Sequence, residues 1–336
     1  MKKILICGAG GFIGGHLANY FSKDENIKLI CVDIKPKDFW FQKFDTAKNF
    51  SLDLKDLKNT LKVTEDIDYI FNFACNMGGM GFIENNKAEC MLSVLVNTNL
   101  LRAALTNKCK KYFFSSSACV YNATKQKKVF IQGLKETDAY PADPEDGYGW
   151  EKLFSERMCR HFYEDFGLET RVARYHNIYG PFGTFDGGRE KAPAALCRKI
   201  IKAKMNNDKT IDVWGDGNQT RSFLYIDDCL KGTINLFESK ETDVFNIGSE
   251  EQVSINQMIE IIEEIAQYKV NKNYQMDKPK GVRGRSSDNS LIYQKLGWKP
   301  SLSLKQGLTK TYKWIENQLV NNDLGMKRFC KSNIEK

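Results

Sequence analysis

The sequence predicts an α/β fold with a doubly wound parallel sheet and a smaller, mixed α/β lobe. Short apolar runs alternate with helix-length stretches in the first half of the chain, a pattern typical of parallel strands joined by helical crossovers. Right-handed crossovers place helices on both faces of such a sheet. The predicted strands cover residues 4–7, 28–33, 69–74, 112–115 and 170–175, and the predicted helices cover residues 12–22, 88–106 and 150–166.

The second half of the chain has a looser pattern, in which Gly, Pro and Arg residues interrupt the apolar runs after about residue 178. Residues 244–247 form a late apolar run that we expect to return to the main sheet. Residues 304–317 are amphipathic and predict a closing helix, and the last 15 or so residues are polar and lysine-rich, which predicts a loose tail. We expect a first domain over residues 1–177 with a returning segment near 221–248, and mainly a second lobe with the polar tail over residues 178–336.

Composition and charge exclude several classes of protein. Of the 336 residues 42% are hydrophobic, but no apolar run approaches the roughly 20 residues that span a bilayer, so we expect no membrane segment. No secretory signal is visible, which favours the cytoplasm. The net charge of +8 suits an anionic ligand, but the basic residues are interspersed with 42 acidic ones, so nucleic acid is not an expected partner. The ten cysteines lack paired spacing, which predicts reduced thiols and no metal site.

A glycine-rich turn connects the first predicted strand to the first predicted helix. Gly8, Gly11 and Gly14 recur at a spacing of three, with Phe12 and Ile13 between them. Glycines at these positions permit a tight turn and a close approach of the backbone to a pyrophosphate, whose charge the helix N-terminus attracts. These five residues therefore predict the phosphate-binding turn of a Rossmann-type domain.

Two acidic residues indicate which dinucleotide binds. Asp33 ends the second strand about twenty residues after the turn, where a carboxylate binds the ribose hydroxyls and repels a 2′-phosphate. Lys35 and Lys37 follow closely and would favour a phosphorylated cofactor, but Asp33 carries more weight because it ends the strand itself. We therefore predict NAD as the cofactor. Asp53 is a candidate for the adenine edge, and the alternative is a simple turn residue.

A tyrosine and a lysine four residues apart predict a catalytic pair. Tyr148 and Lys152 share one face of a predicted helix, where an ammonium and the positive nicotinamide would favour the phenolate. Ser117 lies at the end of the preceding predicted strand. We predict that these three residues act in catalysis and that Tyr148 and Lys152 also contact the cofactor.

Serine, tyrosine and lysine in this order after a glycine-rich turn resemble the extended short-chain dehydrogenase/reductase family, in its sugar-nucleotide branch. Further segments resemble the GDP-mannose 3,5-epimerase family over nearly the whole chain. These segments are residues 76–82, 117–121, 176–183, 187–193, 214–217, 221–223 and 282–285. One departure is visible: Cys75 and Asn76 stand where the loop of that family has Ala-Asp.

The resemblance implies epimerisation of GDP-mannose to GDP-L-galactose with NAD as a recycled cofactor. Tyr148 would take the proton of the C4 hydroxyl while NAD accepts the hydride. The resulting ketone acidifies the C–H bonds at C3 and C5, where Cys119 is the implied base and Lys191 the implied acid. A buried core thiol and a surface or phosphate-binding lysine are the alternatives for these two residues.

The resemblance also implies a substrate site and a homodimer built around the helix that carries Tyr148. Arg283 and Arg285 are the implied ligands of the substrate diphosphate, because guanidinium geometry suits paired oxygens; ordinary surface charge is their alternative. The implied ligands of the GDP-sugar are Gly78, Gly79, Met80, Ser117, Asn177, Lys191, Arg221 and Arg283.

Two other functions compete with this interpretation. Another sugar-nucleotide enzyme, such as a 4-epimerase or an epimerase of a modified GDP-sugar, would share the fold and the cofactor. A 4-epimerase has no use for an additional base and acid, and a dehydratase usually has an acidic pair where Ala118 and Cys119 stand here. A non-catalytic NAD-binding regulator is a different class, whose members typically lose the tyrosine or the lysine that this chain keeps.

Overall fold

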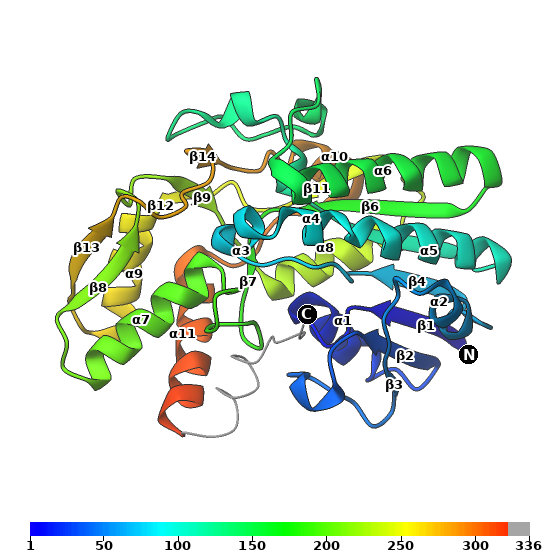
Figure 1. The fold of residues 1–336 in the computed structure, drawn as a ribbon, viewed down its shortest axis with the longest axis horizontal. Coiled ribbons are helices and arrows are strands. Elements are labelled where there is room, and N and C mark those ends of the chain that lie inside the picture. The colour runs from blue at the N-terminus through cyan, green and yellow to red at the C-terminus, as the bar shows by residue number, and fades with distance from the viewer. Residues whose placement is uncertain (322–336) are drawn as a thin grey trace.

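The computed structural model describes residues 1–321, and its centre is a sheet of seven parallel strands in the order β11-β6-β5-β4-β1-β2-β3 (Figure 1). The doubly wound fold that the sequence predicts is confirmed. The strands are β1 (Lys2–Cys7), β2 (Ile27–Asp33), β3 (Lys48–Ser51), β4 (Tyr69–Asn72), β5 (Lys111–Ser117), β6 (Glu169–Tyr175) and β11 (Val244–Ile247).

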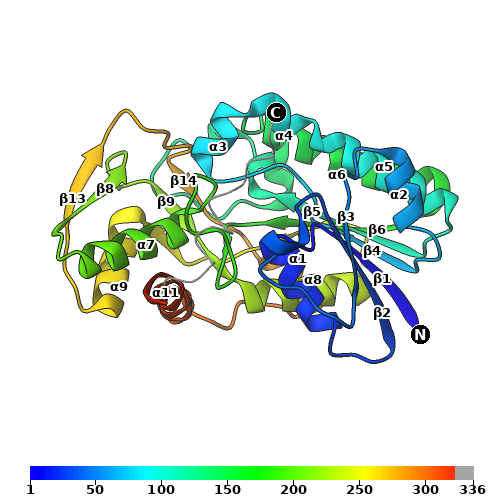
Figure 2. The ribbon, with the colours of Figure 1, turned by 60° about the horizontal axis from the view of Figure 1, so that its bottom comes forward.

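The central strands are buried over most of their length because helices cover both faces of the sheet. In β1 the last four residues are all buried, and in β2 the last five are buried. Figure 2 shows α2 (Leu57–Val63), α5 (Ser93–Thr106) and α6 (Asp146–Phe166) on one side, and α1 (Phe12–Phe21) and α8 (Ile226–Glu238) on the other. Each face therefore has its own buried apolar cluster.

Two helices differ from the sequence-based expectation. The helix expected over 88–106 is divided at Leu92 into α4 (Lys87–Met91) and α5, and α6 begins at Asp146, four residues earlier than expected. The α4 backbone packs closely on the first turn of α6, where a Cβ at Gly147 would lie 2.5 Å from the Lys87 carbonyl oxygen. This contact, which the sequence does not display, places Tyr148 in the first helical turn.

The smaller lobe lies beside the carboxyl ends of the central strands and shares their apolar core (Figure 1). Its strands are β7 (Ile178–Tyr179), β8 (Thr210–Trp214), β9 (Thr220–Ser222), β10 (Leu224–Tyr225), β12 (Gln252–Ser254), β13 (Asn271–Gln275) and β14 (Gly284–Arg285). The helices not yet named are α3 (Met80–Asn85), α7 (Ala192–Met205), α9 (Ile255–Ala266), α10 (Ser290–Leu296) and α11 (Leu304–Val320). The expected closing helix is α11, and the expected polar tail lies outside the described residues.

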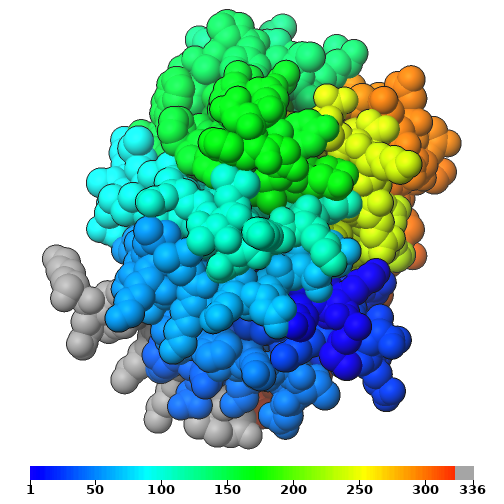
Figure 3. All heavy atoms as spheres, turned by 90° about the vertical axis from the view of Figure 1, so that its right-hand side faces the viewer, coloured from blue at the N-terminus to red at the C-terminus, as the bar shows by residue number. Residues whose placement is uncertain are grey.

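The run at 244–247 becomes β11, which pairs with β6 at the edge of the main sheet. Figure 3 shows late residues, in yellow and orange, beside the green residues of the central segments. In the part of the chain that the structure describes, none of the helices combines the length and the apolarity needed to cross a bilayer.

A buried ion pair ties α6 to the sheet. Arg174 on β6 donates from Nη2 to Glu156 Oε2 at 2.7 Å and from Nε to Oε1 at 2.9 Å. Both side chains are only 3% exposed. Ser116, at the end of β5, donates a further hydrogen bond to Glu156. The pair therefore holds α6 against β6, and the Ser116 hydrogen bond joins the same carboxylate to β5, the strand that ends in Ser117.

Removing one member of this pair should destabilise the fold strongly. We expect Arg174→Met to lower the free energy of unfolding by about 3–5 kcal/mol, because Glu156 would keep a buried charge without a partner. Equilibrium unfolding in urea measures this change. Arg160→Met is the matched control, since Arg160 pairs with Glu164 on the exposed face of α6 and should lose less than about 1 kcal/mol. Equal losses in the two variants would contradict this role.

Candidate active site

The turn between β1 and α1 requires glycine at two of its three predicted positions. Gly8 has φ +82°, and a Cβ there would lie 2.9 Å from the backbone nitrogen of Ala74. A Cβ at Gly14 would lie 2.3 Å from the Gly8 carbonyl oxygen, so α1 can approach the turn only without a side chain there. Gly11 is the N-cap of α1, whose first turn has no capping side chain and no acidic residue. The backbone N–H groups in the first turn of α1 and the dipole of this helix therefore suit a pyrophosphate.

Phe12 and Ile13, the first residues of α1, are half-buried and pack against the core. Phe12 contacts His16 edge to face, with ring centroids 5.3 Å apart. Phe12 also lies close to Gly183, in the loop that leads toward Lys191. Their side chains thus connect the turn to the smaller lobe, while their backbone forms the start of the helix.

Asp33 ends β2, as expected, and is buried. Its Oδ1 accepts a hydrogen bond from the Lys35 backbone nitrogen at 2.9 Å. The Lys35 ammonium donates to the Gly10 carbonyl oxygen at 3.2 Å, so it is turned back onto the glycine turn. Trp40 covers the same turn, because a Cβ at Gly10 would lie 2.6 Å from its indole. Sequence reasoning missed Trp40, which belongs to no motif.

Asp53 follows β3, the strand next to β2. Its Oδ1 accepts from the Lys55 backbone nitrogen at 2.8 Å, as a turn residue would, and its Oδ2 lies 3.9 Å from the Lys55 ammonium. Because parallel strands end at the same edge, Asp33 and Asp53 both lie at the carboxyl edge of the sheet, beside the glycine turn.

The predicted catalytic trio comes together at the end of β5. Ser117 is the last residue of that strand and lies close enough to the Tyr148 phenol to lower its pKa, and the Lys152 ammonium lies 5.7 Å from the centre of the Tyr148 ring. Burial raises the pKa of Tyr148 well above its usual value, and the nearby Cys75 and Cys119 raise it further. Burial alone would lower the pKa of Lys152, but Cys75 and Glu151 raise it, so Lys152 keeps its positive charge.

Cys119 and Lys191 approach this trio from different elements. Cys119 lies in the 3-10 helix η2 (Ala118–Val120) directly after β5, and Lys191 is the N-cap of α7. Burial lowers the pKa of Lys191, and the neighbouring Cys119 and Cys75 partly oppose this effect. Burial raises the pKa of the Cys119 thiol, and the Glu145 carboxylate raises it further.

Two loops that contribute predicted substrate ligands are joined directly. Gly79 donates from its backbone nitrogen to the Arg189 carbonyl oxygen at 3.1 Å, and a Cβ at Gly79 would lie 2.5 Å from the Glu190 carbonyl oxygen. The Asn76 Oδ1 accepts from Arg189 Nη1 at 2.9 Å, and the Arg189 guanidinium stacks on Phe82 at 3.8 Å from the ring centre. The departure at Asn76 therefore keeps an acceptor for Arg189, which holds the loop that carries Lys191.

Gly78 lies against its own loop, because a Cβ there would be 2.8 Å from the Phe82 Cβ. Met80 begins α3 and meets Arg221 at Gly281, where a Cβ would lie 3.0 Å from the Met80 methyl carbon and 3.2 Å from Arg221 Nη2. The Asn177 amide donates to the Ser222 carbonyl oxygen at 3.0 Å. The Asn177 side chain is therefore hydrogen-bonded to the backbone of β9.

The predicted arginines occupy different environments. Burial lowers the pKa of Arg221 to about 10, and Arg221 Nη1 donates to the Thr220 carbonyl oxygen. Arg283 is about one-third exposed and donates to Asp216 Oδ1 at 3.0 Å. Arg285 is buried, and its guanidinium contacts the Cys119 sulfur at 3.6 Å. Arg283 is therefore accessible to a diphosphate, whereas Arg285 is engaged beside the thiol.

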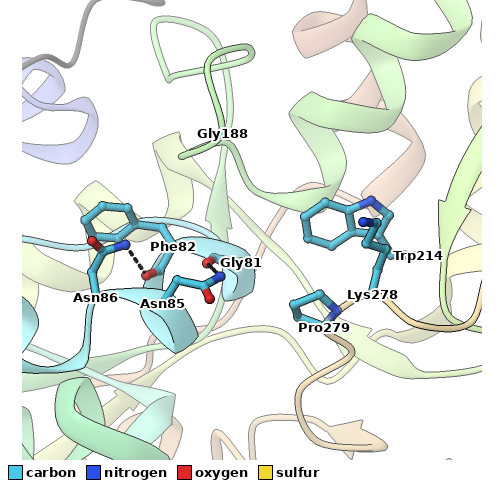
Figure 4. Close-up of a pocket in the computed structure, with 8 residues that line it drawn as sticks. All are labelled: Gly81, Phe82, Asn85, Asn86, Gly188, Trp214, Lys278 and Pro279. Carbon is cyan, nitrogen blue, oxygen red and sulfur yellow. Dashed lines mark hydrogen bonds between the residues drawn. The ribbon is translucent and has the colours of Figure 1, made fainter.

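A pocket of about 420 Å³ opens at the junction of the two lobes. Figure 4 shows the aromatic rings of Phe82 and Trp214 on opposite sides of it, with Lys278 and Pro279 next to Trp214. The lining residues are Gly81, Phe82, Asn85, Asn86, Gly188, Trp214, Lys278 and Pro279. The motif segments of the sequence include Gly81, Phe82, Gly188 and Trp214. They do not include Asn85, Asn86, Lys278 and Pro279, which sequence reasoning missed because they belong to no motif. Among residues 1–321, no cluster of His, Cys, Asp and Glu suits a metal ion.

The parallel sheet, the glycine turn with Asp33, and the Ser117, Tyr148 and Lys152 set define a nucleotide-dependent enzyme of the short-chain dehydrogenase/reductase class. The sequence model of the NAD dependent epimerase/dehydratase family matches residues 4–248. The chain belongs to this family, and NAD is its cofactor.

Two relatives are similar to this chain over nearly its whole length. The GDP-mannose 3,5-epimerase of Arabidopsis thaliana is 46% identical over 318 residues, which cover 94% of this chain and 83% of the relative. GDP-mannose 3,5-epimerase 1 of Oryza sativa subsp. indica is 47% identical over 94% of this chain and 82% of its own length.

Solved structures of epimerases share the fold. UDP-glucuronic acid 4-epimerase from Bacillus cereus, in complex with UDP-glucuronic acid and NAD, has a TM-score of 0.79 and 29% identity, covering 94% of this chain and 99% of its own. UDP-glucose 4-epimerase from Thermotoga maritima has a TM-score of 0.83 with the same coverage, and its 24% identity supports the fold alone.

The place of Asp33 leads to a prediction about cofactor choice. We expect wild-type protein to bind NAD more tightly than NADP, and Asp33→Asn to reduce this preference about tenfold or more, because the variant no longer repels a 2′-phosphate. Fluorescence titration with both dinucleotides measures the ratio. Asp53→Asn is the matched control and should leave the ratio nearly unchanged. Tighter binding of NADP by the wild type would contradict the role of Asp33.

Proposed function

We propose that this enzyme converts GDP-mannose to GDP-L-galactose by inverting C3 and C5 of the sugar. The observation that carries the proposal is that Cys119 packs beside Tyr148 and that Lys191 lies near Cys119. A thiol next to the phenol and an amine near that thiol provide the base and the acid that inversion requires. The 46–47% identity to GDP-mannose 3,5-epimerases over 94% of the chain supports the same substrate.

The reaction begins at the C4 hydroxyl of the sugar. Tyr148 accepts the hydroxyl proton, Ser117 positions the oxygen by a hydrogen bond, and the Lys152 cation favours the phenolate. NAD, held at the glycine turn and Asp33, would supply the hydride chemistry at C4. Because burial raises the pKa of Tyr148 in the protein alone, the positive charges of Lys152 and of the nicotinamide are needed to offset that burial.

The C4 ketone acidifies the neighbouring C–H bonds, and the second stage exchanges protons there. Cys119 as a thiolate removes the proton from carbon, and Lys191 as an ammonium returns one to the opposite face. Since burial lowers the pKa of Lys191, its ammonium is a stronger acid than that of an exposed lysine. A plain 4-epimerase has no step that uses these two groups.

The pocket between Phe82 and Trp214 fits the nucleoside end of the substrate, because aromatic faces on both sides suit a flat base. Arg221 donates to the Lys280 carbonyl oxygen, next to the pocket residue Pro279, and also lies near Cys119. Arg221 and Arg283 supply positive charge for the diphosphate. The backbone groups of Gly78, Gly79 and Met80 would then contact the sugar and the phosphates. Epimerisation of a modified GDP-sugar is the second candidate, since Cys75 and Asn76 change the loop that faces the sugar.

The division of labour follows the two lobes. Residues 1–177, with the returning segment near 221–248, form the domain that holds the NAD site, and residues 178–336 are mainly the substrate-binding lobe and the polar tail. We also place the enzyme in the cytoplasm, because all nine cysteines in the described residues are free thiols, as a reducing compartment would keep them.

The enzyme acts as a homodimer that buries one face of α6. Trp150 and Phe154 lie one turn apart on that helix and are 46% and 56% exposed. Met91, Leu92 and Leu95 add exposed apolar surface on α4 and α5, which contact α6. A patch of this kind on neighbouring helices is typical of a protein–protein interface.

The two chemical stages should separate by mutation. In deuterated water with GDP-mannose, we expect Cys119→Ala and Lys191→Ala to lose deuterium incorporation at C3 and C5 by about two to four orders of magnitude, while hydride still exchanges between C4 and NAD. Tyr148→Phe should lose both stages, because its phenol acts in the hydride step. NMR and mass spectrometry of the sugar measure incorporation, and NADH absorbance or scrambling of a C4 label reports hydride transfer.

Lys202→Ala is the matched control for Lys191→Ala, because Lys202 lies on the same helix and pairs with Asp186 away from the thiol. It should keep the wild-type rate. If Cys119→Ala exchanges deuterium at the wild-type rate, the proposal fails, and 4-epimerase activity becomes the better-supported function.

A single charge should disrupt the dimer. We expect Phe154→Asp to yield monomers, because a carboxylate would be buried in the apolar interface without a partner. Light scattering after size-exclusion chromatography measures the mass. Phe166→Asp is the control: Phe166 is 62% exposed at the far end of α6 and should leave the mass unchanged. A wild-type protein that is monomeric at micromolar concentration would contradict the dimer.

A further inference from the structure

The side chain of Arg285 contacts three other side chains, which are those of Cys119, Glu145 and Gln126. Its Nη1 contacts the Cys119 sulfur at 3.6 Å, its Nη2 donates to Glu145 Oε2 at 2.6 Å, and its Nε donates to Gln126 Oε1 at 2.6 Å. Arg285 and Gln126 are almost fully buried, and the Glu145 side chain is only 11% exposed. The guanidinium therefore cannot leave the sulfur without breaking two buried bonds.

The backbone holds Glu145 in place beside Cys119. The Glu145 nitrogen donates to the Cys119 carbonyl oxygen at 3.0 Å. One turn later, a Cβ at Gly149 would lie 2.4 Å from the same oxygen, so only glycine lets α6 start this close. Gln126 is itself fixed, because its Nε2 donates to the Tyr121 and Asn122 carbonyl oxygens. Rigid elements thus position every partner of Arg285.

Several other polar groups face the Cys119 thiol. From the strand side, Ser117 accepts the Cys119 backbone N–H at 3.2 Å. From α6, Tyr148 lies close enough for its pKa to respond to Cys119. The Lys191 ammonium and the Arg221 guanidinium respond to Cys119 in the same way.

We propose that Glu145 is a positioning residue, which holds the Arg285 guanidinium against the Cys119 sulfur and sets the pH range in which that sulfur becomes a thiolate. Arg285 favours the thiolate, and the Glu145 carboxylate offsets the charge of Arg285 and disfavours it. The balance between these two opposite charges determines how much thiolate is present. Its importance for proton exchange at the sugar rests on the proposed function of Cys119, but the charge balance itself does not.

The direction of the effect follows from the signs of the charges. Replacing Glu145 with Gln keeps a carbonyl oxygen for Arg285 but removes the negative charge, so the pKa of the Cys119 thiol should fall. Replacing Arg285 with Gln removes the positive charge, so the pKa of the same thiol should rise. A purely structural role of Glu145 would move neither value in a set direction.

Alkylation by iodoacetamide as a function of pH tests this, because only the thiolate reacts. The measurement uses the full-length protein without substrate, and a Cys119→Ser protein provides the background of the other thiols. We expect the midpoint of the profile to fall by about one pH unit or more in Glu145→Gln and to rise in Arg285→Gln. Glu145→Asp, which keeps the charge, should stay near the wild type.

Asp146→Asn is the matched control. Asp146 is the next residue, carries the same charge and pairs with Lys87 at 2.7 Å on the surface, so its loss should leave the midpoint unchanged. A Glu145→Gln midpoint equal to that of the wild type would overturn the proposal. If Glu145→Gln does not fold, as judged by circular dichroism, the opposite shift in Arg285→Gln decides, and its absence would likewise overturn the proposal.

The pH profile of deuterium incorporation in the same variants separates this inference from the proposed function. Where both are correct, the acid limb of incorporation moves with the alkylation midpoint, and hydride transfer at C4 does not. If the alkylation midpoint moves while incorporation does not follow, the charge balance stands and the role of Cys119 as the carbon base fails.

Discussion

The close approach of α6 to the end of β5 is the contact on which the candidate site depends. Gly149 allows the helix to start against the Cys119 carbonyl, and Gly147 allows α4 to pack on the same turn. This contact places Tyr148 and Lys152 next to Ser117, although about thirty residues separate them along the chain. Any larger residue at Gly149 would push the helix away from the Cys119 backbone.

Two buried ion pairs on α6 and the segment before it have different consequences. Glu156 and Arg174 face each other with matched geometry and fix the helix to the sheet. Glu145 and Arg285 form an equally short contact, but the guanidinium also contacts a sulfur. In the first pair, Ser116 and the Glu136 carbonyl oxygen add neutral hydrogen bonds to the two charges, so the pair is structural. In the second a titratable thiol shares the cation, so the pair affects chemistry as well as stability.

The junction of the two lobes explains how a departure from the family loop can be accommodated. Asn76 accepts from Arg189, and Arg189 stacks on Phe82, so these contacts join the glycine-rich loop to the loop that carries Lys191. A carboxylate in place of the Asn76 amide would form an ion pair with the same guanidinium. The neutral amide keeps the connection while leaving one more positive charge beside the substrate cleft, where an anionic sugar nucleotide would bind.

The sequence by itself determined the parallel sheet, the glycine turn, the place of Asp33 at the end of β2, and the Ser117, Tyr148 and Lys152 set as a prediction, because strand–helix alternation and short-range spacing encode them. Only the tertiary structure decided the environment of each group. It turned Lys35 back onto Gly10, buried Tyr148 so that its pKa rises, and placed Arg285 on a thiol rather than in an open anion site. Burial and charge pairing arise from contacts between residues far apart in the chain, such as Arg285 and Glu145, and no local pattern records such contacts.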